Sequence, residues 1–381
     1  MERLIRFVRE QYGTDEYIPL HAPVLGELEK RYVIEALDSG YVSSVGPQVA
    51  EFENAIARFT GAKHAVATVN GTAALHVSLV LAGVMPGDEV ITQSITFVAT
   101  CNAIRYCGAH PLLVDIDLAT LGMSPDSLAE FLQDNAYLDD RGRCVNRRTG
   151  ATIRACVPMH NFGHPVRIDA IAAICDRWNL VLIEDTAESL GSSFRGRHTG
   201  LFGSHAALSF NGNKIITTGG GGMVITDDDA LAARARHITT TAKAKHPWLF
   251  VHDEVGFNYR MPALNAALGC AQFERLEGHL ARKRMLAECY AEWFSRTDYH
   301  FNREPAECRS NYWLNSFLVN SPEERDDVLR QTNALGVMTR PVWTPMHYLE
   351  LYKDCLRSDL KNSEWLESRL VNLPSSPPGA A

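Results

Sequence analysis

Short apolar runs alternate with segments of helical spacing through the first two thirds of the chain, and this alternation restricts the fold more than any other feature. The apolar runs are continuous, as expected of strands buried on both faces. They lie at 64–69, 90–92, 112–114, 155–158 and 180–183. Segments with helical spacing lie between them, at 73–81, 96–106, 124–132 and 168–178. This order predicts a mainly parallel sheet covered by crossover helices.

The pattern changes near Asp253, and a second unit follows. Residues 263–294 have the spacing of one long helix, and a strand, a helix and another strand are predicted at 313–319, 322–335 and 337–342. A chain of 381 residues is long enough for two units. We therefore expect a large α/β domain with an N-terminal arm over 1–252. A joint, the long helix and a small α+β domain should occupy 253–381, and the tail from Pro374 should be loose.

Composition argues against several classes of partner. The formal net charge is −8, which disfavours nucleic acid or an anionic membrane as the main partner. The nine cysteines are scattered without a CxxC pair, so neither a disulfide framework nor a zinc ribbon is expected. The N-terminal segment lacks the continuous apolar run of a signal peptide or membrane span, and we expect a cytoplasmic protein. His160 and His164 have no third ligand at suitable spacing, so no metal is predicted.

Polar residues follow two of the predicted strands. Asn70, Gly71 and Thr72 lie where the first strand ends and a helix begins, and backbone N–H groups at a helix start can hold a phosphate. Taken alone, such a triplet is more often an ordinary helix cap. The strand at 180–183 leads into Glu184 and Asp185. An acid at the carboxyl end of a parallel strand is placed to meet a ligand, although it can also cap a turn.

Lys214 follows a third strand, at 206–210, in a turn that precedes the glycine run at 219–222. A single lysine is most often a solvated surface charge. Here a phosphate cradle, an aspartate and a lysine each follow their own strand. These are the parts that pyridoxal 5'-phosphate (PLP) requires: an anchor, a partner for the pyridine nitrogen and an amine for a Schiff base. The sequence therefore predicts a PLP enzyme that uses Lys214.

Asp185 and Lys214 have the catalytic roles in this interpretation. An ionised Asp185 would keep the pyridine nitrogen protonated, so that the ring can accept the electron pair released at the substrate carbon. Lys214 must be neutral to attack a carbonyl, and its freed amine can then move a proton between the substrate and the cofactor. Phe97 is a candidate to stack on the ring, although an aromatic residue at a strand-to-helix junction is more often part of the core.

Four motifs contain these residues or lie close to them: NGTAA at 70–74, EDTAES at 184–189, SFNGNK at 209–214 and GFNYRM at 256–261. They resemble motifs of the DegT/DnrJ/EryC1/StrS sugar aminotransferases, which share the aspartate-aminotransferase fold (fold type I). The resemblance covers nearly the whole chain. The segments FNGNKIITTGGGG at 210–222 and TTTAK at 239–243 are similar to the LegC-type branch, which acts on nucleotide-linked 4-keto-6-deoxy amino sugars.

The resemblance implies further cofactor contacts. Gly71, Thr72 and Ser209 would bind the phosphate, and Phe97 would stack on the ring. Glu188 would lie beside the ring, where many relatives have glutamine or histidine. The asparagine matching Asn258 reaches the phosphate of the neighbouring subunit, which implies a homodimer with shared active sites.

The resemblance also implies a reaction. We expect amino transfer from L-glutamate to C4 of a UDP-linked 4-keto-6-deoxy-N-acetylhexosamine, with the cofactor cycling between PLP and its amine form, PMP. The alternative sugar is a GDP- or dTDP-linked 4-keto-6-deoxyhexose. Residues proposed to contact the substrate are Arg260, Arg340, Trp343 and His347.

Three other activities are weighed against amino transfer. A PLP-dependent dehydratase is disfavoured because the known ones resembling this chain replace the lysine with histidine. A nicotinamide-dependent oxidoreductase would need a GxGxxG turn after the first strand. A PLP-binding regulator would carry a separate DNA-binding module, for which the N-terminal segment is too short.

Overall fold

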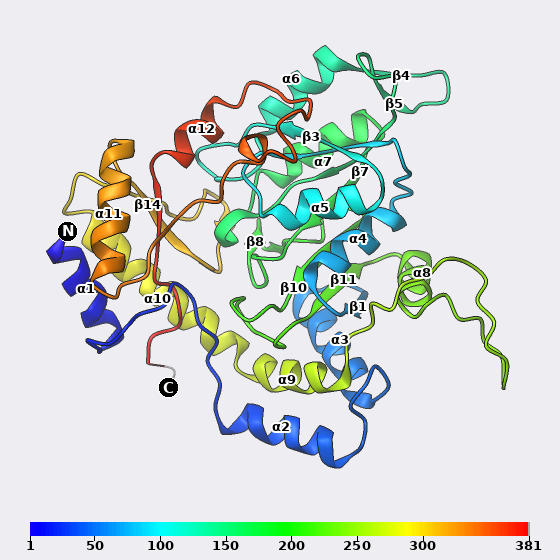
Figure 1. The fold of residues 1–381 in the computed structure, drawn as a ribbon, viewed down its shortest axis with the longest axis horizontal. Coiled ribbons are helices and arrows are strands. Elements are labelled where there is room, and N and C mark those ends of the chain that lie inside the picture. The colour runs from blue at the N-terminus through cyan, green and yellow to red at the C-terminus, as the bar shows by residue number, and fades with distance from the viewer. Residues whose placement is uncertain (380–381) are drawn as a thin grey trace.

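The computed structural model describes residues 1–379, which form a large seven-stranded sheet, a small four-stranded sheet and two minor sheets of three and two strands (Figure 1). The strands of the large sheet are β1 (His64–Thr68), β2 (Glu89–Gln93), β3 (His110–Val114), β6 (Ile153–Val157), β7 (Val181–Asp185), β10 (His205–Ser209) and β11 (Gly222–Thr226). Their order is β1-β11-β10-β7-β6-β2-β3; β11 runs antiparallel to both of its neighbours, and the other four neighbouring pairs are parallel. The predicted fold class, a mainly parallel sheet in an α/β domain, is confirmed.

Helices cover both faces of this sheet. On one face lie α4 (Gly71–Leu81), α5 (Val98–Tyr106) and α8 (Asp229–Thr239). On the other lie α3 (Pro47–Thr60), α6 (Pro125–Asn135), α7 (Ile168–Arg177) and α9 (Ala263–Glu274), with α2 (Glu27–Asp38) packed outside α9. Val90 and Ile91 of β2 are both fully buried and belong to the cores on opposite faces. Neighbouring residues of a strand point to opposite faces, so this burial explains the continuous apolar runs.

The small sheet lies in the last third of the chain. It consists of β12 (His300–Phe301), β14 (Asn315–Leu318), β15 (Arg340–Pro341) and β16 (Leu370–Leu373), in the antiparallel order β12-β14-β16-β15. The remaining helices are α1 (Glu2–Tyr12), α10 (Leu276–Phe294), α11 (Pro322–Ala334) and α12 (Lys361–Glu367), and short 3-10 turns lie at Asn161–Gly163 and Met346–Tyr348. The two minor sheets consist of short strands. One pairs β4 (Ala136–Leu138) with β5 (Cys144–Asn146), and the other has the order β13 (Cys308–Arg309), β8 (Ser193–Phe194) and β9 (Arg197–His198). Because α9 packs against α2 and α3, the division of the chain at residue 253 stays a prediction.

The long helix expected over 263–294 is wrong in one respect, because the structure has two helices there. They meet at Arg275, which ends α9 and begins α10 with φ −97° and ψ −5°. The Arg275 side chain pairs with the buried Glu29 of α2 at 3.2 Å. No glycine or proline lies at the break, and the partner residue is distant in sequence, so the helical pattern could not reveal it.

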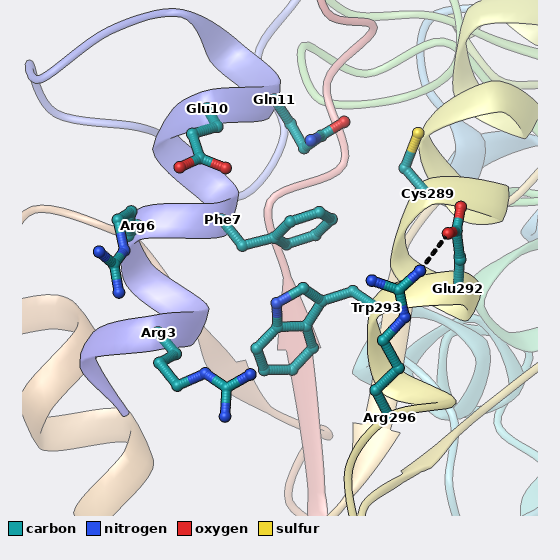
Figure 2. A pocket seen from close by; sticks show the side chains of 9 residues that line it. All are labelled: Arg3, Arg6, Phe7, Glu10, Gln11, Cys289, Glu292, Trp293 and Arg296. Atoms are coloured by element: carbon teal, nitrogen blue, oxygen red, sulfur yellow. Dashed lines mark hydrogen bonds and ion pairs between the residues drawn. The ribbon is translucent and has the colours of Figure 1, made fainter.

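The N-terminal arm is a helix, as predicted, and it packs against α10. Phe7 stacks on Trp293 with ring centroids 5.5 Å apart, and Leu4 and Val8 are buried beneath it. An open groove of about 410 Å³ lies beside this contact. Figure 2 shows the side chains that line it, among them arginine and glutamate residues of α1, Glu292 of α10, and Arg296, which follows α10 and pairs with Glu292. The contact anchors the start of the chain to the small unit.

The expectation of a loose tail from Pro374 is also wrong over the first residues. Ser375 is fully buried, and its hydroxyl accepts the Asn315 N–H at 2.8 Å. Its carbonyl accepts a hydrogen bond from Nζ of Lys283, which is itself fully buried. A buried amine requires hydrogen-bond partners, and the tail supplies one of them. Residues 380–381 lie outside the described part of the chain. Within residues 1–379, no helix has both the length and the apolar character needed to cross a membrane.

Candidate active site

A pocket of about 280 Å³ lies where the carboxyl ends of β6, β7 and β10 meet the start of α4. This is the edge of an open parallel sheet where ligands bind. The pocket brings together eight of the residues that the sequence nominated: Gly71, Thr72, Phe97, Asp185, Glu188, Ser209, Lys214 and Trp343. They come from separate strand ends, so the sheet topology assembles them.

The start of α4 provides donors for an anion. Asn70 caps the helix, and its Oδ1 accepts the N–H of Ala73 at 2.8 Å. The first N–H groups of a helix, here those of Gly71 and Thr72, have no acceptor within the helix. A Cβ atom at Gly71 would lie 2.8 Å from Cβ of Ser209, so only glycine allows the helix start to approach that serine. The arrangement fits a phosphate between the helix N-terminus and the Ser209 hydroxyl.

Asp185 ends β7 and is buried, with 2% of its surface exposed. Thr100 Oγ1 donates to its Oδ2 at 2.8 Å, and the Ala187 N–H donates to Oδ1 at 3.2 Å. Burial raises the pKa of Asp185, and the hydrogen bonds from Thr100 and Ala187 and the charge of Lys214 oppose this rise only in part. A cation beside this carboxyl would therefore stabilise its ionised form, which is what a protonated pyridine nitrogen supplies.

The neighbouring carboxylate, Glu184, points to the opposite face of the sheet. Its side chain accepts N–H groups from Gly200 at 2.8 Å and Gly203 at 2.8 Å, and it contacts His160 Nε2 at 3.0 Å. Burial raises the pKa of Glu184, but the interactions with His160 and these glycines outweigh it, so the pKa lies below its ordinary value. Glu184 and His160 therefore hold the loop at 200–203, and they lie outside the pocket lining.

Lys214 extends into the pocket from the turn after β10, with 13% of its side chain exposed. Its Nζ lies 3.2 Å from Glu188 Oε1 and 4.1 Å from the centre of the Trp313 ring. The other Glu188 oxygen accepts the Phe162 N–H at 2.9 Å. Burial raises the pKa of Glu188 to about 7, against the opposing effects of Lys214 and Phe162. The amine thus has one carboxyl partner and one aromatic partner.

Sequence analysis missed two residues that complete the pocket. Thr100 donates a hydrogen bond to Asp185. Its only sign in the sequence was a hydroxyl residue one turn after Phe97 in a predicted helix. Trp313 contacts Lys214, but the sequence shows it only as the first residue of a predicted strand. Neither pattern indicates which side chains meet across the fold.

Four residues proposed from the sequence lie outside the pocket lining of this single chain: Asn258, Arg260, Arg340 and His347. His347 is buried between Ser94 Oγ at 2.7 Å and Glu364 Oε1 at 3.3 Å. Arg340 is exposed in β15. The proposed roles of these residues stay predictions.

The pocket fits PLP on three counts taken together. An anion site at the start of α4, a buried carboxyl that lacks a full cationic partner and a lysine amine all line one cavity. Phe97, half exposed at the mouth, offers an aromatic face to a flat ring. This is the donor and acceptor set that the cofactor requires.

Comparisons with known proteins agree with this chemistry. A model of the DegT/DnrJ/EryC1/StrS aminotransferase family matches residues 23–378. The GDP-perosamine synthase of Caulobacter vibrioides is 38% identical, over 94% of this chain and 93% of that protein. The GDP-perosamine synthase of Escherichia coli O157:H7 is 36% identical, over 95% and 94%. The crystal structure of the aminotransferase TlmJ from Streptoalloteichus hindustanus has a TM-score of 0.84 at 31% identity, covering 94% of this chain and 93% of that one. The chain therefore belongs to the DegT/DnrJ/EryC1/StrS aminotransferase family, and it is a PLP-dependent sugar aminotransferase.

Proposed function

We propose that this enzyme transfers an amino group from L-glutamate to C4 of a GDP-linked 4-keto-6-deoxymannose. The observation that carries this choice is the similarity to two GDP-perosamine synthases, at 38% and 36% identity over at least 94% of the chain. This similarity favours the GDP-linked alternative over the UDP-linked sugar that the sequence motifs suggested. The narrower resemblance to the LegC-type branch stays a prediction.

The pocket residues have different roles in the proposed amino transfer. When bound, PLP supplies a ring that accepts electrons and a carbon that carries the amino group between donor and acceptor. The start of α4 and Ser209 would hold its phosphate, and Asp185 would keep a positive charge at the pyridine nitrogen; all of these line the pocket. The Lys214 amine moves a proton at the reacting carbon.

A substrate panel tests the proposed sugar. The purified enzyme would be given GDP-, UDP- and dTDP-linked 4-keto-6-deoxy sugars with glutamate, and amino-sugar formation would be followed by mass spectrometry. We expect kcat/KM to be highest for the GDP-linked mannose derivative, because a site built to hydrogen-bond one base rejects another that leaves its polar groups unpaired. A higher kcat/KM with a UDP-linked N-acetyl sugar would overturn the assignment and restore the first expectation.

We also propose that the enzyme works as a homodimer with shared sites. The segment at 244–255 extends from the body beside α8 (Figure 1) and carries the strongly exposed Trp248 (77%), Phe250 (82%) and Val255 (86%). Large apolar side chains exposed together mark interaction surfaces. Asn258 follows this segment directly. Burial of the segment against a second copy would bring Asn258 near the partner's pocket.

A mixing experiment tests this sharing. The loss of one hydrogen bond from Asn258 to a phosphate should cost roughly 1.5–3 kcal/mol, or about one to two decades in PLP affinity. Asn258→Ala and Lys214→Ala subunits should each be poorly active alone. In a mixed dimer, one site keeps its own Lys214 and the partner's intact asparagine, so activity should return on mixing. No recovery in mixed dimers, verified by native mass spectrometry, would mean that Asn258 stabilises only its own local turn.

A further inference from the structure

We propose that Trp313 is a positioning residue that, together with Glu188, holds the Lys214 amine in a resting place whenever the lysine is not bonded to the cofactor. This inference rests on the proposed function of the same pocket. Like Trp343, Trp313 comes from the small unit and joins a site built mainly by the large sheet, since it lies two residues before the strand β14 of the small sheet.

The indole ring is tied to the turn that carries the lysine. Trp313 Nε1–H donates to the Asn213 carbonyl at 2.7 Å, and Asn213 directly precedes Lys214. In this geometry the Lys214 Nζ lies 4.1 Å from the ring centre. An ammonium group at this distance from an indole face is attracted by the ring, and more strongly when water is excluded. Trp313 is 4% exposed, so its ring lies in a nearly dry environment.

Buried hydrogen bonds connect Trp313 and Glu188, the two residues that contact the Lys214 amine. Asn311 Oδ1 accepts a hydrogen bond from the backbone N–H of Trp313 at 2.8 Å, and Asn311 Nδ2 donates one to the backbone carbonyl of Glu188 at 2.8 Å. On the far side, the buried Lys283 donates to the Trp313 carbonyl at 3.1 Å. Asn311 is 1% exposed and Lys283 is fully buried. The distance between the carboxyl and the ring is therefore set by buried hydrogen bonds, independently of the lysine between them.

Glu188 is the second residue that holds the Lys214 amine. It is buried, accepts the Phe162 N–H, and lies 3.2 Å from the Lys214 amine. Its pKa, raised to about 7 by burial, allows the carboxyl to gain or lose a proton near neutral pH. Glu188 is therefore placed to accept a hydrogen bond from the Lys214 amine.

Amino transfer explains why a resting place matters. The lysine must leave the cofactor while the amino group is carried and must return to it afterwards. A free lysine side chain has many rotamers, and restricting it to one position close to the ring saves the entropy of finding that position again. Trp313 and Glu188 provide this restriction.

An NMR measurement tests the position of the amine directly. The full-length enzyme would be labelled with 13C at the lysine ε-carbons and loaded with PMP, a state in which Lys214 is free. The Lys214 signal is assigned by its absence in Lys214→Arg. We expect its ε-methylene protons to be shifted upfield by the indole ring current, and this shift to disappear in Trp313→Leu and to persist, smaller, in Trp313→Phe. A Lys214 signal at the position of solvated lysines in the wild-type enzyme would overturn the proposal.

The control variant is Trp293→Leu, which removes a tryptophan at the contact between α1 and α10 (Figure 2). It should leave the Lys214 signal unchanged. If Trp313→Leu does not fold, the wild-type shift and its reduction in Trp313→Phe decide the question. The measurement needs neither the sugar nor the amino donor. An upfield signal in an enzyme that is inactive on every sugar would therefore refute the proposed function and leave this inference intact.

Single-turnover kinetics provide a second test of the role of Trp313. In single-turnover reactions with glutamate, Trp313→Leu should lower the rate of the half-reaction roughly twofold to thirtyfold, which corresponds to the range of cation–π energies, and leave KM for glutamate unchanged. Trp313→Phe should recover most of the rate because it keeps an aromatic face. Equal losses in the leucine and phenylalanine variants would show that the Asn213 hydrogen bond, and not the ring face, is what matters, and would overturn the resting place.

Discussion

Replacement of Lys214 by alanine should abolish turnover, with a loss of roughly 10⁴-fold or more. Lys214 is the one lysine among the residues that line the pocket, and its amine points at the space between Glu188 and Trp313. Proton transfer by a positioned side chain alone contributes about 10²- to 10⁴-fold, and the loss of the nucleophilic amine adds to this. The variant should still bind PLP, because the phosphate site and Asp185 remain. The measurement is the rate of amino-sugar formation beside the PLP content of the purified variant.

Borohydride reduction of the wild-type enzyme, followed by peptide mapping, checks the same assignment chemically. The pyridoxyl group should appear on Lys214. Lys243 and Lys245 are the nearest alternatives along the chain, and Lys243 Nζ lies instead over the exposed Phe250 ring at 4.2 Å. A label on either of them would contradict the role of Lys214. Lys214→Arg is the matched variant that keeps a cation in the pocket and should be equally inactive.

Asp185→Asn should lower the rate of the half-reaction with glutamate by roughly 10²- to 10³-fold, the usual effect of removing a buried electrostatic partner of the reacting group. The neutral amide keeps the shape of the side chain and the hydrogen bond with Thr100, but it cannot stabilise a protonated pyridine nitrogen. Some PLP binding should remain. A single-turnover measurement with glutamate, read from the cofactor spectrum, gives the rate.

The adjacent carboxylate provides the control for this prediction. Glu184→Gln removes a charge one residue away, on the opposite face of the strand, where it binds His160 and backbone N–H groups. It should lower thermal stability and leave the half-reaction rate of the folded enzyme close to that of the wild type. If Asp185→Asn and Glu184→Gln gave equal half-reaction rates, another group would have to serve the pyridine nitrogen.

Local sequence patterns were sufficient to predict the large sheet and to select Asp185 and Lys214 as residues of one site. Strand residues such as Val90 and Ile91 are buried on both faces, and this leaves a continuous apolar run that can be seen without coordinates. Asp185 and Lys214 each follow such a run. Because the carboxyl ends of parallel strands lie at one edge of a sheet, recognising the strands was enough to bring the two residues together.

Features that depend on distant partners could not be predicted in this way. The break between α9 and α10 at Arg275 coincides with a pairing to Glu29, and the tail after Pro374 is held in place by Lys283. In both cases the local sequence favours the wrong state, a continuous helix or a loose end. The deciding partner is a buried polar side chain elsewhere in the chain, and the cost of leaving such a group without a hydrogen-bond partner exceeds the local preference.

The sequence by itself determined the fold class and the cofactor, and it predicted the lysine and aspartate that would serve the cofactor, because these inferences follow from strand periodicity and from residues at strand ends. Only the tertiary structure decided what surrounds the Lys214 amine. Trp313 enters the pocket from the segment that leads into β14 of the small sheet, and Asn311 and Lys283 fix its position through buried hydrogen bonds. Such contacts join residues far apart in the chain, and their geometry arises only when the two sheets pack together.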